Sequence, residues 1–218
     1  MPDYAAARRN MVDSQLRTNR VTDEALLAAI AHIPRERFVP PTLSGVAYID
    51  EDIPLGNERY LMEPMVLGRM IQAAEIQPSD SVLDVGCATG YSSAIAARLA
   101  ASVIGLESDS RLAKAATDNL AALRIDNAVI VSGDMRAGHA RQAPYDVILF
   151  QGAIDEIPAQ IAAQLAEGGR LVAVLAPPGA TGRAVLALKA GGFVSRRDLF
   201  DAATPPLPGF ELAPGFRF

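Results

Sequence analysis

The sequence predicts an α/β fold in which helices cover both faces of a mostly parallel sheet that carries an antiparallel edge. Three observations predict it. Short runs rich in Val, Ile and Leu recur from residue 81 onward, Ala-rich helical segments lie between them, and a glycine-containing turn directly follows the first run. Buried strands that alternate with helices are typical of parallel sheets.

The first part of the chain contains two predicted helices with a proline-rich passage between them. Residues 22–32 begin with Thr22, which can cap a helix, and continue with apolar residues at helical spacing until shortly before Pro34. Residues 34–64 are aperiodic and too long for an ordinary connection, so we expect this passage to be functional or partly ordered into short strands. Pro64 suits the first turn of a helix that its apolar successors continue.

The second part of the chain alternates regularly. The apolar runs that we interpret as strands are residues 81–85, 102–107, 128–132, 145–150 and 170–176. The Ala-rich segments that we interpret as helices are residues 91–100, 109–123, 155–166 and 181–190. Two further strands are expected at residues 193–200 and 210–218, the last pairing antiparallel at an edge.

Composition narrows the classes of partner. The 218 residues carry a net charge of −5 without a Lys/Arg cluster, so we expect no nucleic acid partner. The single cysteine, Cys87, forbids an intrachain disulfide, and one cysteine with two histidines predicts no metal site. No membrane-length apolar run and no secretory leader are evident, so we expect a cytoplasmic protein that has no membrane partner.

The most informative stretch is VLDVGCATGYSS, residues 82–93. Glycines in a turn after a strand let the backbone approach a ligand, and ligands bind at the carboxyl ends of parallel strands. The G-x-A-x-G spacing differs from the G-x-G-x-x-G of dinucleotide folds. With the preceding Asp84, it resembles the first motif of class I S-adenosylmethionine-dependent methyltransferases, whose turn holds the amino-acid and ribose parts of the cofactor. Taken alone, the motif also allows a plain turn.

Three further features follow in the order that this class shows. Glu107 ends the second strand, 21 residues after Gly86, where a carboxylate can accept hydrogen bonds from ribose hydroxyls. Asp134 follows the third strand, where the class presents an acid to the adenine amine, and Gln151 ends the fourth. Singly, Glu107 or Asp134 would be a solvated strand end. Together the resemblance implies S-adenosyl-L-methionine as cofactor, bound by Asp84, Gly86, Cys87, Ala88, Gly90, Tyr91, Glu107, Ser108, Asp134, Met135 and Gln151.

The segments upstream narrow the resemblance to one family. The phrases P-R-x-x-F-V-P at residues 34–40 and A-Y-x-D-x-x-x-P-[IL]-G at residues 47–56 resemble those of the protein-L-isoaspartate O-methyltransferases, over most of residues 11–175. The resemblance implies a seven-stranded, Rossmann-like methyltransferase sheet. It also implies an N-terminal helical extension with a substrate-side loop at residues 1–63, and an S-adenosylmethionine-binding domain at residues 64–218.

The sequence departs from this family directly after Gly56. The family continues x-G-Q-T-I-S-x-P, where Thr and Ser help to hold the isoaspartyl peptide, whereas this chain continues N-E-R-Y-L-M-E-P. Arg59, Tyr60 and Met62 thus replace Gln, Thr and Ser, and we expect them to act on the substrate side. A carboxylate acceptor is already anionic at neutral pH, so Glu58 and Glu63 would repel it unless Arg59 lies between.

Three hypotheses follow for the function. The first is a methyltransferase of this kind with an altered acceptor, a peptide, a protein or a small molecule. The second is genuine isoaspartyl repair, and the third is a non-catalytic S-adenosylmethionine-binding regulatory protein. If the two acids of the loop only face water, the loop carries no information about the acceptor.

Overall fold

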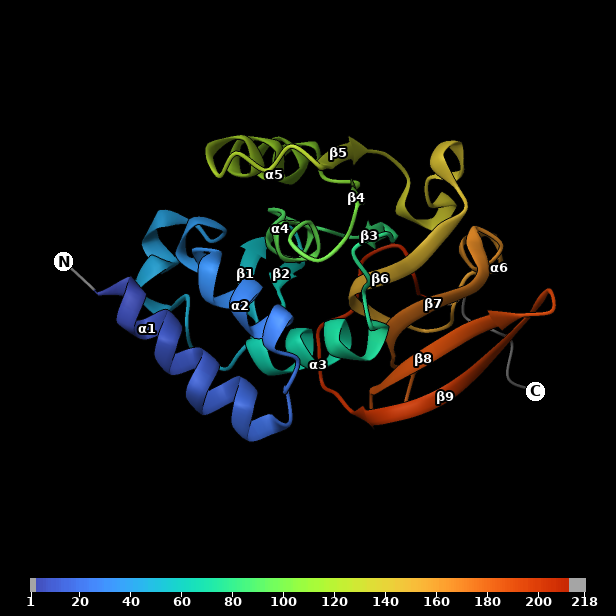
Figure 1. Cartoon of the computed structure of the whole chain (residues 1–218), viewed down its shortest axis with the longest axis horizontal. Coiled ribbons are helices and arrows are strands. Elements are labelled where there is room, and N and C mark those ends of the chain that lie inside the picture. The colour runs from blue at the N-terminus through green and yellow to red at the C-terminus, as the bar shows by residue number, and fades with distance from the viewer. Residues whose placement is uncertain (1–2, 212–218) are drawn as a thin grey trace.

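The computed structural model describes residues 3–211 and contains one seven-stranded sheet (Figure 1). The strands lie in the order β5-β4-β3-β6-β7-β8-β9; β3 to β7 are parallel, whereas β8 and β9 are antiparallel at one edge. Their bounds are β3 Ser81–Val85, β4 Ser102–Glu107, β5 Ala128–Ser132, β6 Tyr145–Ile154, β7 Leu165–Leu175, β8 Arg183–Ala190 and β9 Phe193–Asp201. This architecture confirms the predicted fold class.

Alternate residues of the strands point into two separate cores, because successive side chains of a strand face opposite ways. One core holds Val82, Val103 and Val147 and is covered by the N-terminal helices, α3, α4 and the two leucines of α5. The other holds Leu83, Ile104 and Ile148 under α6 and the segment around Leu207. The helices are α1 Tyr4–Met11, α2 Glu24–His32, α3 Pro64–Ala74, α4 Tyr91–Ala96, α5 Ser110–Ala122 and α6 Ala159–Ala162.

The N-terminal part continues from α1 through a π turn, Val12–Leu16, and a 3₁₀ turn, Arg17–Asn19, into α2. Its α1 and α2 lie on the opposite side of the molecule from the β8–β9 hairpin (Figure 1). The proline-rich passage forms two further 3₁₀ segments, Arg35–Arg37 and Pro41–Val46, and a small hairpin of β1 Ile53–Gly56 and β2 Arg59–Leu61. Short 3₁₀ turns at Met135–Ala137 and Ala140–Gln142 precede β6.

Several local predictions are wrong. The cap of α2 is Asp23, whose carboxylate accepts hydrogen bonds from two backbone N–H groups, and not Thr22. Residues 155–166 form only the single turn α6, after which β7 begins. Residues 181–190 form no helix but contain strand β8, because pairing with β7 and β9 on both edges outweighs the helical propensity of Ala, Leu and Lys.

Two further expectations concern the predicted last strand and membrane-spanning helices. No strand includes Phe210 or Glu211, and the rest of the predicted strand at 210–218 lies outside the described residues. Within residues 3–211, no helix combines the length and the apolar character needed to cross a membrane.

Candidate active site

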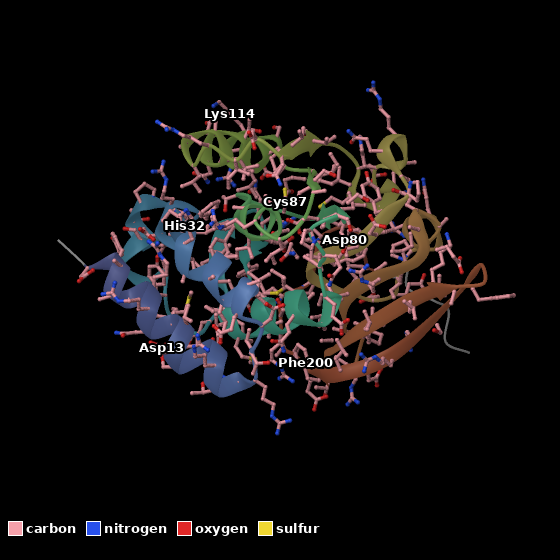
Figure 2. All side chains as sticks on the ribbon, viewed as in Figure 1. Asp13, His32, Asp80, Cys87, Lys114 and Phe200 are labelled. Atoms are coloured by element: carbon pink, nitrogen blue, oxygen red, sulfur yellow. The ribbon has the colours of Figure 1, made fainter. Side chains whose placement is uncertain are left out.

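The glycine-containing turn lies at the point where the sheet order reverses. Strand β3 has β4 on one side and β6 on the other, which is the arrangement that opens a ligand crevice at the carboxyl ends of strands. Gly86 and Gly90 adopt φ values of +75° and +91°, in the left-handed region that glycine tolerates best. Ala88 between them also has a positive φ, +50°. The turn lies near the centre of the molecule, as the position of Cys87 shows (Figure 2).

Asp84 forms the base of the turn and is fully buried. Ser92 and Ser93 at the start of α4 each donate a hydrogen bond of 2.6 Å to its Oδ2, and the amide of Gln151 donates one of 2.7 Å to Oδ1. Burial raises the pKa of Asp84, while these three hydrogen bonds favour its anion. Asp84 therefore holds β3, α4 and the end of β6 together and has no acceptor position directed at solvent.

Glu107 ends β4 beside the turn and is also fully buried. The N–H of Ala88 donates to its Oε2 at 2.8 Å, and those of Ser108 and Asp109 donate to Oε1 at 2.9 and 3.1 Å. Its remaining capacity is taken by Arg59, whose Nη1 lies 3.2 Å from Oε1 and whose Nη2 lies 3.0 Å from Oε2. The carboxylate predicted to meet a ribose is thus ion-paired within the chain.

Arg59 reaches this position from the substrate-side hairpin. Its side chain is 3% exposed, and besides Glu107 it donates to the carbonyl of Gly86 at 2.6 Å and to the sulfur of Met135 at 3.7 Å. From the sequence we expect Arg59 to lie beside the acceptor. In the structure its guanidinium lies among the predicted cofactor residues instead.

A C-terminal segment, residues 205–210, covers the same crevice from the other core. The N–H of Leu207 donates to the carbonyl of Ala153 at 2.7 Å, and the N–H of Ala153 donates to the carbonyl of Pro205 at 2.9 Å. The side chain of Leu207 packs on Gly86, where a Cβ atom would lie 2.7 Å from its Cδ1, and its backbone packs on Gly152. The sequence did not predict this contact, because the prolines of the segment do not indicate which part of the chain it packs against.

The remaining predicted cofactor residues separate into two groups. Met135 and Cys87 are buried near the crevice, and burial raises the pKa of the Cys87 thiol. Asp134 and Ser108 are exposed, and the carboxylate of Asp134 accepts a hydrogen bond of 2.9 Å from a backbone N–H of the following 3₁₀ turn. Within residues 3–211, no group of three or more His, Cys, Asp or Glu side chains could hold a metal ion.

The ring of Tyr91 belongs to a separate contact with the N-terminal extension. Tyr91 is buried, lies edge-on to Phe38 with ring centroids 5.3 Å apart, and has the guanidinium of Arg35 at 4.9 Å over its ring. Arg35 is fully buried and donates to the carbonyls of Ala47 and Met62 at 2.7 and 2.8 Å. This arginine joins three segments of the proline-rich passage, a role that its motif alone did not reveal.

The substrate-side hairpin ends in a tight turn. Asn57 and Glu58 both have positive φ, 51° and 56°, as in the two-residue turns that favour Asn and Gly. The amide of Asn57 donates to the carboxylate of Asp109 at 2.9 Å, and Arg111 donates to the carbonyl of Leu55 at 3.3 Å. The tip is therefore attached to the β4–α5 connection by an exposed hydrogen bond and to the first turn of α5 by a partly buried one.

The other two residues predicted on the substrate side lie in the second strand of the hairpin and just after it. Tyr60 is half-buried, whereas Met62 is buried. Glu63 follows, with its N–H bound to the carboxylate of Asp52 at 2.9 Å. Burial and nearby carboxylates, Asp52 first among them, raise the pKa of Glu63 to about 7. The loop thus carries a half-buried acid that titrates near neutral pH.

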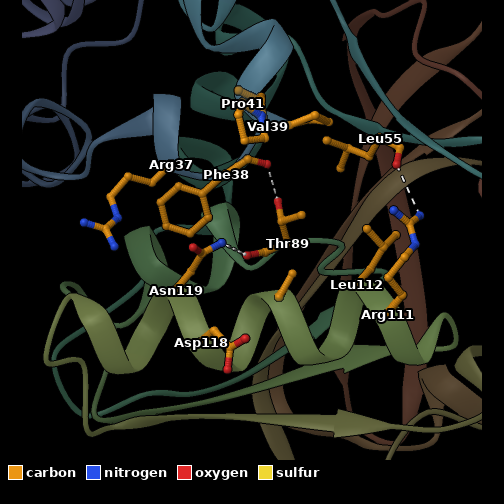
Figure 3. A pocket seen from close by; sticks show the side chains of 12 residues that line it. Arg37, Phe38, Val39, Pro41, Leu55, Thr89, Arg111, Leu112, Asp118 and Asn119 are labelled. Carbon is orange, nitrogen blue, oxygen red and sulfur yellow. Dashed lines mark hydrogen bonds between the residues drawn. The ribbon is translucent and has the colours of Figure 1, made fainter.

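A cavity of about 410 Å³ lies beside the turn, between the N-terminal extension and α5 (Figure 3). The hydroxyl of Thr89 donates to the carbonyl of Phe38 at 2.6 Å, and the amide of Asn119 donates to the carbonyl of Thr89 at 3.0 Å at its floor. No sequence pattern predicted this cavity, because its walls come from four segments that are distant in the chain. It is lined by Arg37, Phe38, Val39, Pro40, Pro41, Leu55, Thr89, Arg111, Leu112, Ala115, Asp118 and Asn119.

Solved structures share the whole arrangement of elements. A structure of a protein-L-isoaspartate O-methyltransferase superposes with a TM-score of 0.81 at 24% identity, over 94% of this chain and 67% of that one. A second, from Plasmodium falciparum and in complex with S-adenosyl-L-homocysteine, superposes with a TM-score of 0.79 at 18% identity, over 95% and 99%. At these identities the likeness shows the fold.

Sequence relatives are closer. The protein-L-isoaspartate O-methyltransferase of Koribacter versatilis (strain Ellin345) is 39% identical over 206 residues, which are 94% of this chain and 92% of that protein. That of Methylorubrum extorquens (strain PA1) is also 39% identical, over 93% of this chain and 86% of its own length. The family model described as protein-L-isoaspartate(D-aspartate) O-methyltransferase matches residues 7–199. The chain therefore belongs to the protein-L-isoaspartate(D-aspartate) O-methyltransferase family.

Proposed function

We propose that this protein is an S-adenosylmethionine-dependent methyltransferase whose acceptor differs from the isoaspartyl carboxylate. The observation that carries the proposal is the excess of acids in the substrate-side loop. The loop of residues 47–64 contains five acids and a single basic residue, Arg59, so acids outnumber bases whether or not Arg59 is paired with Glu107. The loop consequently presents a negative field to an incoming acceptor.

The residues of the crevice fit the cofactor in part. A buried carboxylate next to a glycine turn at the switch point of the sheet suits ribose hydroxyls, and Glu107 and Gly86 would hold that part of the molecule. Arg59 already occupies the carboxylate of Glu107, so the fit requires Arg59 to leave Glu107. When bound, S-adenosylmethionine supplies a methyl group on a positively charged sulfur.

The charges of the loop favour a neutral or cationic acceptor. Two unit charges about 4 Å apart interact by roughly 4 kcal/mol at an effective dielectric of 20, so uncompensated carboxylates disfavour an anion strongly. Glu63, with its pKa near 7, is suited to accept a proton from a neutral nucleophile. Met62 cannot donate the hydrogen bond that a family Ser would offer to a carboxylate.

Methyl transfer from labelled S-adenosylmethionine tests the proposal. We expect an isoaspartyl peptide to be a poor acceptor, and a panel of peptides and small molecules with amine or hydroxyl nucleophiles to contain better ones. Turnover of the isoaspartyl peptide equal to that of a family enzyme with the Q-T-I-S loop would contradict us. A triple variant, Arg59→Gln with Tyr60→Thr and Met62→Ser, introduces the Gln, Thr and Ser of that loop and should gain isoaspartyl activity.

Two alternatives are separated by the same measurements. Genuine isoaspartyl repair predicts efficient peptide methylation by the unaltered protein. A non-catalytic regulator predicts calorimetric binding of S-adenosylmethionine with no acceptor methylated, and the absence of binding at millimolar ligand would exclude both that reading and the enzyme. We also propose a cytoplasmic location, because a buried lone Cys87 needs no oxidising compartment.

A further inference from the structure

The hydrogen-bond acceptor positions of the Glu107 carboxylate are all occupied by groups of the chain itself. A carboxylate offers about four lone-pair positions, and here three backbone N–H groups and two guanidinium nitrogens share them. The three backbone groups belong to the turn and the β4–α5 connection, so they bind Glu107 as long as the protein is folded. Oε1 already accepts two of these N–H groups and Nη1 of Arg59 lies 3.2 Å from it, whereas Nη2 takes the position left open on Oε2, which a ribose hydroxyl would use.

The surrounding contacts make this occupation specific to Arg59. Its Nη2 also donates to the carbonyl of Gly86, in the turn where we expect the backbone to approach a ligand. The same nitrogen lies close enough to Gly86 that a Cβ atom there would be 3.2 Å away from it. Leu207 closes the opposite side of Gly86. Glu107, Gly86 and Met135 are buried for this reason, although they lie at the end of the strands where a ligand is expected.

The hairpin tip next to Arg59 has a strained backbone and hydrogen bonds to the β4–α5 region. Gly56, Asn57 and Glu58 are three consecutive residues with positive φ, and a glutamate in this region is strained. Outside the hairpin, the tip is tied through the hydrogen bond of Asn57 to Asp109 and the contact of Arg111 with the carbonyl of Leu55. The first of these bonds is exposed, where water replaces it readily, and the second is partly buried.

We propose that Arg59 is a built-in competitor of the cofactor, which occupies the ribose position of Glu107 until the hairpin tip lifts it out of the crevice. The proposal rests on the proposed function of the same site. Only the fraction of molecules with Arg59 withdrawn binds the cofactor, so the apparent dissociation constant is raised by the inverse of that fraction. The crevice is thereby closed by a cation that belongs to the substrate-side loop, and cofactor entry and loop position are coupled.

Calorimetric titration with S-adenosylhomocysteine tests the competitor directly. We expect Arg59→Gln to bind at least about tenfold more tightly than the unaltered protein, as expected if the competent fraction rises from about a tenth or less to nearly one. The matched control is Arg98→Gln, which removes an exposed arginine from the end of the α4 segment and should leave the affinity unchanged. Circular dichroism and thermal melting verify that each variant is folded.

The outcomes distinguish the two proposals. Tight binding by the unaltered protein that Arg59→Gln does not improve would overturn the competitor and leave the methyltransferase proposal standing. No binding by either protein at millimolar ligand would overturn both. If Arg59→Gln does not fold, hydrogen exchange on the unaltered protein decides. The competitor predicts faster exchange of the amides at residues 57–61 when ligand is bound, and slower exchange, as for a lid that closes, would refute it.

Discussion

Replacement of Arg35 by methionine should destabilise the whole N-terminal half of the site. Arg35 is fully buried, and it donates hydrogen bonds of 2.7 and 2.8 Å to the carbonyls of Ala47 and Met62 while lying 4.9 Å from the ring centroid of Tyr91. Arg35→Met keeps the apolar stem and removes all three interactions. The two carbonyls are then left without their donor in a site that excludes water.

The magnitude follows from these contacts. Each charge-assisted hydrogen bond contributes about 1.5–3 kcal/mol, and a desolvated cation over an aromatic ring contributes about 0.5–2 kcal/mol. Against this, methionine avoids the cost of burying a cation whose Nη1 has no hydrogen-bond partner among the described residues, and burial already lowers the pKa of Arg35. We expect a net loss of about 3 kcal/mol, which corresponds to roughly 6–12 °C in Tm for a domain of this size.

Urea unfolding followed by circular dichroism measures this loss. The matched control is Arg37→Met, an exposed arginine of the same 3₁₀ turn, which should change stability by less than about 0.5 kcal/mol. A loss below about 1 kcal/mol for Arg35→Met, or an equal loss for both variants, would refute the reasoning that the two carbonyl contacts hold the passage together.

Three further predictions concern the crevice and the loop. The pKa of Glu63 is raised to about 7 in the folded state, above its ordinary value near 4.5. Protonation of Glu63 therefore stabilises the folded state fully below pH 4.5, and this contribution is lost as the pH rises through 7. Glu63→Gln should raise Tm at pH 8 relative to the unaltered protein and not at pH 4.5. Leu207→Ala removes a buried side chain from Gly86 and should lower the free energy of unfolding by about 2–4 kcal/mol in urea, and a change near zero would show that the segment is not packed there. Ser93→Ala removes one of the three donors to buried Asp84 and should cost about 1.5–3 kcal/mol in the same assay. An unchanged midpoint would contradict a stabilising role for this hydrogen bond.

Prediction from the sequence succeeded where local pattern and fold agree. The runs at residues 81–85, 102–107 and 128–132 match β3, β4 and β5 in both bounds, because strands of parallel sheets are nearly continuous in apolar residues. Residues 181–190 failed for the opposite reason. Their Ala, Leu and Lys residues favour a helix locally, and only the pairing with strands on both edges makes them β8.

The site divides in the same way. The sequence by itself determined the parallel strands, the glycine turn after Asp84 and the acid at the end of β4, because each depends on residue types at fixed local spacing. Only the tertiary structure decided that Arg59 pairs with Glu107, 48 residues away, and that Leu207 covers Gly86. Those contacts arise from the docking of a hairpin and a C-terminal segment onto the sheet, and docking depends on surfaces that form only once the chain has folded.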